Sequence, residues 1–312
     1  MSGSMLSIVV PIYNSEKCIN VLYTRISLAL QNFPLDYELI LVDDGSKDDS
    51  WLLISTLAKQ DKRVKGLRFT RNFGQHYGIT AGLDFCQGDW VVVMDCDLQD
   101  PPETIPILYE KAINAQHDIV FVKRLNGPES PLHKLLTRSF YRVFRLLSGM
   151  EHEEYSGNFC ILSKPVLENY KTMREQARFF SGLINWTGFS VGAIEAKRED
   201  RHVGRSTYTF RKRLKLATDA IIAYSDKPLR ISVKVGFGIS ALALLYGITL
   251  LLKSVIYHTP ISNWSSLMAS LYFLSGIIIG NLGIIGIYLG RTFDEVKRRP
   301  LYIIKERTCN AS

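Results

Sequence analysis

Two long apolar segments near the C-terminal end constrain the fold of this chain more than any other feature. Val235–Leu252 and Leu267–Leu289 contain no charged residue, and each has about the 17–25 residues that a helix needs to cross a bilayer. The alternative is a pair of buried core helices. The segments are adjacent, however, and follow a stretch long enough to hold its own core. We therefore expect a two-helix transmembrane hairpin over residues 235–289.

The distribution of basic residues predicts how this hairpin is oriented. Lysines and arginines gather at residues 211–230, before the first segment, and at residues 291–307, after the second. The connection between the segments carries only Lys253 as a full cation. Because cytoplasmic flanks of membrane helices are enriched in lysine and arginine, we expect both flanks, and the preceding domain, to be cytoplasmic.

The formal net charge of +8 predicts an anionic partner. Nucleic acid, anionic lipid and a phosphorylated substrate all fit that description. The sequence has no zinc-finger spacing and no basic run interleaved with aromatic residues, so nucleic acid ranks last. The five cysteines include no CxxC pair, which is typical of reduced thiols in a protein that faces the cytosol.

The N-terminal part alternates strand and helix patterns. Continuous apolar runs, typical of strands buried on both faces, lie at Ile8–Tyr13, Leu39–Val42 and Val91–Met94. Helical patterns lie at Glu16–Gln31, Asp49–Ala58, Gly78–Cys86 and Glu103–Ala115. This alternation predicts a doubly wound, mostly parallel α/β sheet in a domain over residues 5–207, with ligands bound at the carboxyl ends of the strands.

Two basic amphipathic segments lie between the sheet and the hairpin. Pro131–Leu147 has leucines and phenylalanines at helical spacing and basic residues toward the opposite side. This pattern fits a helix in the membrane interface, or else an ordinary surface helix docked on the sheet. Residues 208–230 form the second segment, next to the first apolar segment, and its candidate interfacial helix is Tyr208–Tyr224. We expect residues 290–312 to form a basic cytoplasmic tail.

Acidic turns follow the predicted strands. Asp95 and Asp97 leave a buried strand one residue apart, before Pro101 and Pro102. Such a pair suits a hard divalent cation that also binds substrate phosphates, although a lone D-x-D is more often a solvated turn. Turns containing Asp43 and Asp44 end the second strand. Three strand ends at one sheet edge therefore favour a nucleoside pocket, in which an acidic side chain bonds ribose or base donors.

Several motifs in this order resemble those of the family 2 glycosyltransferases. They are V-V-P-I-Y-N at residues 9–14, D-D-G-S-K-D-D-S at 43–50, R-N-F-G-Q at 71–75, D-C-D-L-Q-D-P-P-E at 95–103 and R-x-x-G-x-S-x-Y at 201–208. The set is most similar to the polyprenyl-phosphate branch, which includes dolichol-phosphate mannose synthases and bactoprenol-phosphate glucosyltransferases. The resemblance covers nearly the whole chain, including the hairpin, and implies a GT-A type fold.

The resemblance also implies roles for individual residues. Residues implied to bind the nucleotide sugar are Pro11, Tyr13, Asn14, Asp43, Asp44, Gly74, Gln75 and Asp95. Those implied to hold Mg²⁺ or Mn²⁺ are Asp95, Asp97 and Gln99. Those implied to face phosphate groups, including the lipid phosphate, are Lys123, Arg124, Arg201, Arg205 and Ser206; a solvated loop charge is the alternative for these basic residues. The implied catalytic residues are Asp95, Asp97, Asn158 and Arg201.

One position departs from the family pattern. Many relatives have aspartate in an A-G-D-F segment, where this chain reads Ser156-Gly157-Asn158-Phe159. A lipid phosphate is already anionic near neutral pH, so it can attack without a general base. Asn158 would then orient the substrate by hydrogen bonds, and its presence could signal a different donor sugar.

Together these inferences predict an inverting glycosyltransferase of a bacterial inner membrane. It would transfer a sugar from a nucleotide sugar, expected to be a UDP-sugar, to polyprenyl phosphate for cell-surface glycan assembly, such as that of lipopolysaccharide O-antigen. Two alternatives remain: a transferase acting on a lipid-linked glycan, and a non-catalytic membrane scaffold that binds nucleotides. The resemblance also implies a homo-oligomer, as a tetramer.

Overall fold

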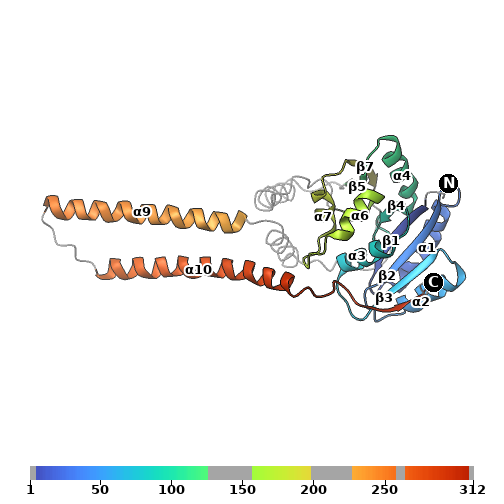
Figure 1. Cartoon of the computed structure of the whole chain (residues 1–312), viewed down its shortest axis with the longest axis horizontal. Coiled ribbons are helices and arrows are strands. Elements are labelled where there is room, and N and C mark those ends of the chain that lie inside the picture. Colours follow the sequence, from blue (N-terminus) through green and yellow to red (C-terminus); the bar gives the residue numbers. More distant parts are fainter. Residues whose placement is uncertain (1–4, 126–156, 198–226, 258–263, 309–312) are drawn as a thin grey trace. The chain divides into compact units, whose positions relative to one another are not determined.

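The computed structural model describes residues 5–125, 157–197, 227–257 and 264–308 (Figure 1). The chain divides into two compact units. The first holds the N-terminal α/β part together with the C-terminal stretch from Arg299 onward. The second holds two long helices near the C-terminal end.

One mixed sheet forms the centre of the first unit. Its strands are β1 (Met5–Ile12), β2 (Asp36–Asp43), β3 (Val64–Phe69), β4 (Trp90–Val93), β5 (Ile119–Leu125), β6 (Cys160–Ser163), β7 (Val191–Lys197) and β8 (Ile304–Arg307). They lie in the order β7-β5-β6-β4-β1-β2-β3-β8. Strands β4, β1, β2 and β3 are mutually parallel, whereas β6 and β8 run antiparallel to their neighbours. The predicted mostly parallel α/β fold is confirmed.

Helices cover both faces of this sheet, which explains why the central strands are mostly apolar. Side chains of α1 (Glu16–Ala29), α2 (Ser50–Gln60) and α4 (Ile105–Asn114), the last preceded by the 3₁₀ turn η1 (Pro102–Thr104), share one buried cluster with alternate residues of β1. Helix α3 (Gln75–Phe85) lies on the other face, where Gly82 faces Val9 of β1. Helices α6 (Lys164–Thr172) and α7 (Phe180–Trp186) contact α3.

The C-terminal strand β8 closes the β3 edge of the sheet. Three contacts fix the segment around it: the Tyr302 hydroxyl donates to Asp84 (2.7 Å), the Tyr302 ring stacks on Phe69 (5.3 Å between centroids), and the Gly66 N–H donates to Thr308 Oγ1 (2.7 Å). An uncovered edge strand would expose unpaired N–H and C=O groups. The sequence does not predict this strand, which lies within the segment expected to be a tail.

The second unit contains helices α9 (Lys227–Tyr257, 31 residues) and α10 (Trp264–Val296, 33 residues), which contact each other. Both apolar segments are therefore helical, as predicted. Among the described residues, one stretch, Leu274–Val296 of α10, has the length and apolar composition of a membrane span. The predicted amphipathic segments, Pro131–Leu147 and most of residues 208–230, lie outside the described residues.

Candidate active site

The strand order reverses between β1 and β4, the position at which open α/β sheets form a ligand-binding crevice. The chain builds β1, β2 and β3 outward in one direction and then returns to add β4 on the other side of β1. In open α/β sheets, ligands bind at the carboxyl ends of the two strands that flank such a reversal. The residues that follow these strands are Tyr13 and Asn14 after β1, and Asp95 and Asp97 after β4.

Pro11 marks the point at which β1 and β4 separate. Val9 accepts a hydrogen bond from Met94 at the end of β4 (3.1 Å), whereas Ile12 accepts one from Asp44 on the β2 side (2.8 Å). Backbone polar groups alternate between the two neighbouring strands, so position 11 is directed to the β4 side, where pairing has ended. A proline is tolerated there because no ladder N–H is required. Pro11 is buried against Gly78 of α3.

Asp95 contacts two other predicted site residues. Its Oδ1 accepts hydrogen bonds from Gln75 Nε2 (2.6 Å) and from Asn158 Nδ2 (3.3 Å). Gln75 is the first residue of α3, and Asn158 lies two residues before β6, which pairs with β4 through Val93 and Cys160. Residues separated by 20 and 63 positions in the sequence therefore meet at one carboxylate.

Asp97 lies in a tight, strained turn beside Asp95. Its Oδ1 accepts a hydrogen bond from the Gln99 N–H (3.2 Å), and between these residues Leu98 has φ of 59°. A bulky residue in the left-handed region costs about 1–2 kcal/mol. Such strain clusters at functional sites, and the second strained residue near the crevice is Asn14, with φ of 48°.

The two aspartates fit a divalent cation that is completed by a ligand. Both are partly exposed, while Cys96 between them is buried. Burial raises the pKa of the Cys96 thiol, and the negative charges of Asp97 and Asp95 add to this effect. Within the described ranges, no group of three or more His, Cys, Asp or Glu residues could hold a metal by itself. Mg²⁺ sites that bind substrate phosphates commonly use only one or two carboxylates, so these residues suit that kind of site.

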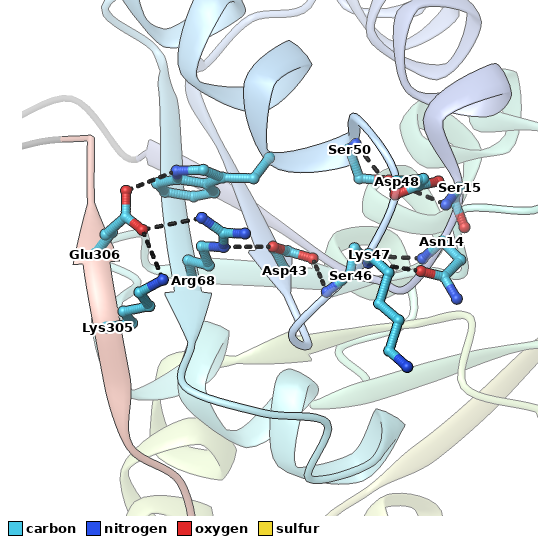
Figure 2. A network of polar contacts seen from close by, with 11 residues as sticks. Asn14, Ser15, Asp43, Ser46, Lys47, Asp48, Ser50, Arg68, Lys305 and Glu306 are labelled. Carbon is cyan, nitrogen blue, oxygen red and sulfur yellow. Dashed lines mark hydrogen bonds and ion pairs between the residues drawn. The ribbon is translucent and has the colours of Figure 1, made fainter.

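The turn after β2 is tied to the turn after β1 (Figure 2). Asp43 Oδ1 accepts a hydrogen bond from the Ser46 N–H (2.9 Å), and Ser46 Oγ accepts one from the Asn14 N–H (2.9 Å). Asn14 Oδ1 in turn accepts from the Lys47 N–H (2.9 Å). Tyr13 is 45% exposed, so its ring is accessible beside these turns.

Asp44 holds the loop that leads into α3. Its two carboxylate oxygens accept hydrogen bonds from the backbone N–H groups of Phe73 (2.6 Å) and Gly74 (2.8 Å). Burial raises the pKa of Asp44, although these two bonds act in the opposite direction. The resemblance implied that Asp44 contacts the nucleoside; the structure places it as a support for the loop that carries Gln75.

Two glycines make the approach of this loop possible. Gly45 has φ of +68°, and a Cβ added there would lie 2.6 Å from the carbonyl carbon of Arg71. Gly74, which precedes α3, has φ of +114°. Glycine adopts positive φ at little steric cost. Gly74 therefore shapes the backbone at the start of α3.

The predicted phosphate-binding residues lie partly on β5 and partly outside the described residues. Lys123 and Arg124 lie in β5, which β6 separates from β4. Arg201, Arg205 and Ser206 lie outside the described residues. Arg68 was not predicted as a site residue, and its Nε lies 3.4 Å from Asp43 Oδ2. The available signal was a second cation, after Lys65, in a strand buried on both faces.

Comparison with known proteins identifies relatives over nearly the whole chain. Residues 7–191 match the family described as Glycosyl transferase family 2. The uncharacterized glycosyltransferase YkcC of Bacillus subtilis (strain 168) is 38% identical over 303 residues, covering 96% of this chain and 93% of that protein. The SfII prophage-derived bactoprenol glucosyl transferase of Shigella flexneri is 36% identical over 302 residues, covering 96% of this chain and 97% of that protein.

A solved structure shares the fold. Glucosyl-3-phosphoglycerate synthase from Mycobacterium tuberculosis, in complex with Mn²⁺ and uridine-diphosphate-glucose, is similar with a TM-score of 0.52. The two sequences are 19% identical, and the match covers 71% of this chain and 78% of that one.

Proposed function

We propose that this chain, which belongs to glycosyl transferase family 2 and is a glycosyltransferase, transfers a sugar from a UDP-sugar to polyprenyl phosphate. The reaction inverts the anomeric centre and takes place at the cytoplasmic face of a bacterial inner membrane. The product is a lipid-phosphate sugar for cell-surface glycan assembly.

The observation that carries this proposal is the junction of Gln75, Asp95 and Asn158 beside Asp97, at the crevice between β1 and β4. Asp95 and Asp97, together with Gln99, would hold a divalent cation, Mg²⁺ or Mn²⁺. When bound, the cation neutralises charge on the donor diphosphate as the nucleotide leaves. The solved neighbour with Mn²⁺ and uridine-diphosphate-glucose supports this choice of cofactor and donor.

The position of Asp43 favours uracil as the base of the donor. Its Oδ2 is fully buried and has no hydrogen-bond partner among the described residues. Arg68 Nε lies 3.4 Å from this oxygen and compensates its charge without a hydrogen bond, so a ligand N–H that reaches the carboxylate would supply the hydrogen bond that it lacks. Uracil offers one such N–H. Tyr13 and Asn14, on the neighbouring turn, would flank the nucleoside.

The chemistry requires one displacement and no general base. An anionic oxygen of the polyprenyl phosphate attacks the anomeric carbon, the bond from that carbon to the diphosphate oxygen breaks, and UDP leaves with the bonding electrons. One displacement inverts the anomeric configuration. Asn158 cannot accept a proton from an acceptor hydroxyl, which agrees with an acceptor that is already ionised. Its amide instead orients Asp95.

The lipid acceptor is supported by the Shigella relative, which is named a bactoprenol glucosyl transferase. Membrane topology adds a second argument. The first unit contains residues before α9 and also β8, which follows α10 and pairs with β3. A chain that leaves a domain and rejoins it must cross a bilayer an even number of times. If Leu274–Val296 of α10 crosses, α9 supplies the matching crossing, and its uncharged stretch Val235–Leu252 is long enough.

The test is an assay of transfer by the full-length protein in membranes. The membranes receive labelled UDP-, GDP- and TDP-sugars, with and without pure polyprenyl phosphate, in Mn²⁺ or in chelator. Label should enter an extractable lipid-monophosphate sugar only with the added lipid, the metal and a UDP-sugar. Label appearing on a larger lipid-linked glycan instead would favour that acceptor and refute this one.

A matched pair of variants tests the metal assignment. Asp97→Asn should abolish transfer without loss of folding, because it removes one carboxylate from the cation site. Asp49→Asn removes an exposed carboxylate from the β2–α2 turn and should leave transfer unchanged. Normal transfer by Asp97→Asn would remove the metal assignment.

A further inference from the structure

A line of charged side chains connects the C-terminal strand with the turn after β2 (Figure 2). Glu306 in β8 accepts a hydrogen bond from Arg68 Nη1 in β3 (2.9 Å). Arg68 Nε lies 3.4 Å from Oδ2 of Asp43, at the end of β2. Three neighbouring strands therefore each contribute one residue.

Asp43 depends on Arg68 for its compensating charge. The Asp43 side chain is completely buried, and its Oδ2 forms no hydrogen bond with the described residues. A buried carboxylate without a nearby cation would be strongly unfavourable. Among the salt bridges of the described residues, Asp43 has one, and its partner is Arg68.

Arg68 depends in turn on Glu306 for its orientation. The two oxygens of Glu306 are held by different donors, since Oε1 accepts from Arg68 and Oε2 from the Trp51 indole N–H (2.9 Å). The Arg68 guanidinium also lies over the Trp51 ring, 5.8 Å from its centroid. Desolvation acts to raise the pKa of Glu306, but the hydrogen bonds from Trp51 and Arg68 outweigh it, so the pKa is lowered. Glu306 is therefore an anion that fixes the guanidinium between two strands.

We propose that Glu306 is a positioning residue for nucleotide recognition. By holding Arg68 beside Asp43, it keeps a compensating cation against this carboxylate and fixes the carboxylate at the end of β2. The inference rests on the proposed function, because it assumes that Asp43 faces the nucleoside. Since β8 follows α10 in the chain, the donor site depends on a strand attached to the long helices. Thermodynamic reciprocity then requires that nucleotide binding favour the docked state of β8.

The experiment measures UDP affinity by calorimetry in MnCl₂, using full-length protein in detergent. Glu306→Gln keeps the shape and removes the charge; Tyr302→Phe removes the hydrogen bond to Asp84 from the same segment and leaves Arg68 untouched. Glu306→Gln should weaken UDP binding by about fivefold or more. The donor KM should rise by a similar factor, with kcat within about twofold of its original value. Tyr302→Phe should change neither quantity.

Two further measurements separate a positioning role from a general structural one. In an Arg68→Ala background, Glu306→Gln should weaken UDP binding no further, because the two residues act as one unit. In the unmodified protein, UDP should slow hydrogen exchange at the amides of Ile304–Arg307, which tests the coupling even if a variant fails to fold.

The outcomes distinguish this inference from the proposed function. If the unmodified protein binds no UDP, the proposed function fails, and the inference fails with it. If it binds UDP, and Glu306→Gln binds equally well, only the positioning role is refuted. A loss in Tyr302→Phe as large as in Glu306→Gln would also refute it, because strand docking alone would then explain the effect.

Discussion

Replacing Asn158 with aspartate places a second carboxylate beside Asp95. The amide nitrogen of Asn158 lies 3.3 Å from Asp95 Oδ1. At that separation two negative charges repel by about 5 kcal/mol for an effective dielectric constant of 20, and by about 1 kcal/mol in bulk water. Protonation limits this cost, since neutralising an aspartate of ordinary pKa at pH 7 requires about 4 kcal/mol. We therefore expect Asn158→Asp to destabilise the metal-free protein by about 1–4 kcal/mol at pH 7.

The assay is thermal unfolding of the full-length protein in detergent. In chelator at pH 7, the variant should unfold several degrees below the original protein, since about 1 kcal/mol shifts Tm by about 2–4 °C for a domain of this size. At pH 5 the difference should shrink, because protonation then costs only about 1.5 kcal/mol. Added Mn²⁺ should reduce the difference further, since the cation neutralises the new charge.

Asn158→Ala is the matched control, because it removes the amide without adding charge. Its destabilisation should depend on neither pH nor Mn²⁺. Equal stability of Asn158→Asp and the original protein in chelator at pH 7 would refute the geometry at Asp95. If the Tm of Asn158→Asp is lowered by the same amount at both pH values and with or without Mn²⁺, the electrostatic explanation is refuted.

Three more predictions follow from the described contacts. Gly45→Ala should cost more stability than Gly188→Ala in denaturant unfolding: both glycines have positive φ, but only the first would clash with Arg71, so Gly188→Ala isolates the backbone strain of about 1–3 kcal/mol. Burial lowers the pKa of His76 from 6.5 to about 4. The unfolded state therefore takes up a proton at His76 before the folded state does, and the free energy of unfolding falls by about 3 kcal/mol between pH 6.5 and pH 4. In His76→Asn the free energy of unfolding should fall less steeply over this pH range. UDP with Mn²⁺ should raise the Tm of the original protein, because a UDP concentration of 100 times Kd stabilises the folded state by about 2.7 kcal/mol. The same addition should leave the Tm of Asp97→Asn unchanged.

Local patterns predicted the parallel core well. The strands around Ile8–Tyr13, Leu39–Val42 and Val91–Met94 are confirmed, because a strand buried on both faces is apolar at most positions. The helices after them are also confirmed, with boundaries that differ by a few residues. The short antiparallel strand β6 was not predicted from the sequence, although its pairing with β4 places Asn158 near Asp95.

In the candidate site, too, some features follow from local sequence and others depend on the tertiary structure. That Asp95 and Asp97 follow a strand end is a property of the sequence alone. That Asp44 binds the loop before α3, and that Asn158 reaches Asp95, depends on which strands become neighbours.

The sequence by itself determined the kind of sheet, the two long apolar helices and the acidic turns, since each depends on residues close together in the chain. Only the tertiary structure decided that Glu306 would meet Arg68, 238 positions earlier, beside the turn of Asp43. Periodicity records which face of an element is buried but not which element covers it. That choice is made by strand order and edge pairing, which depend on the whole chain.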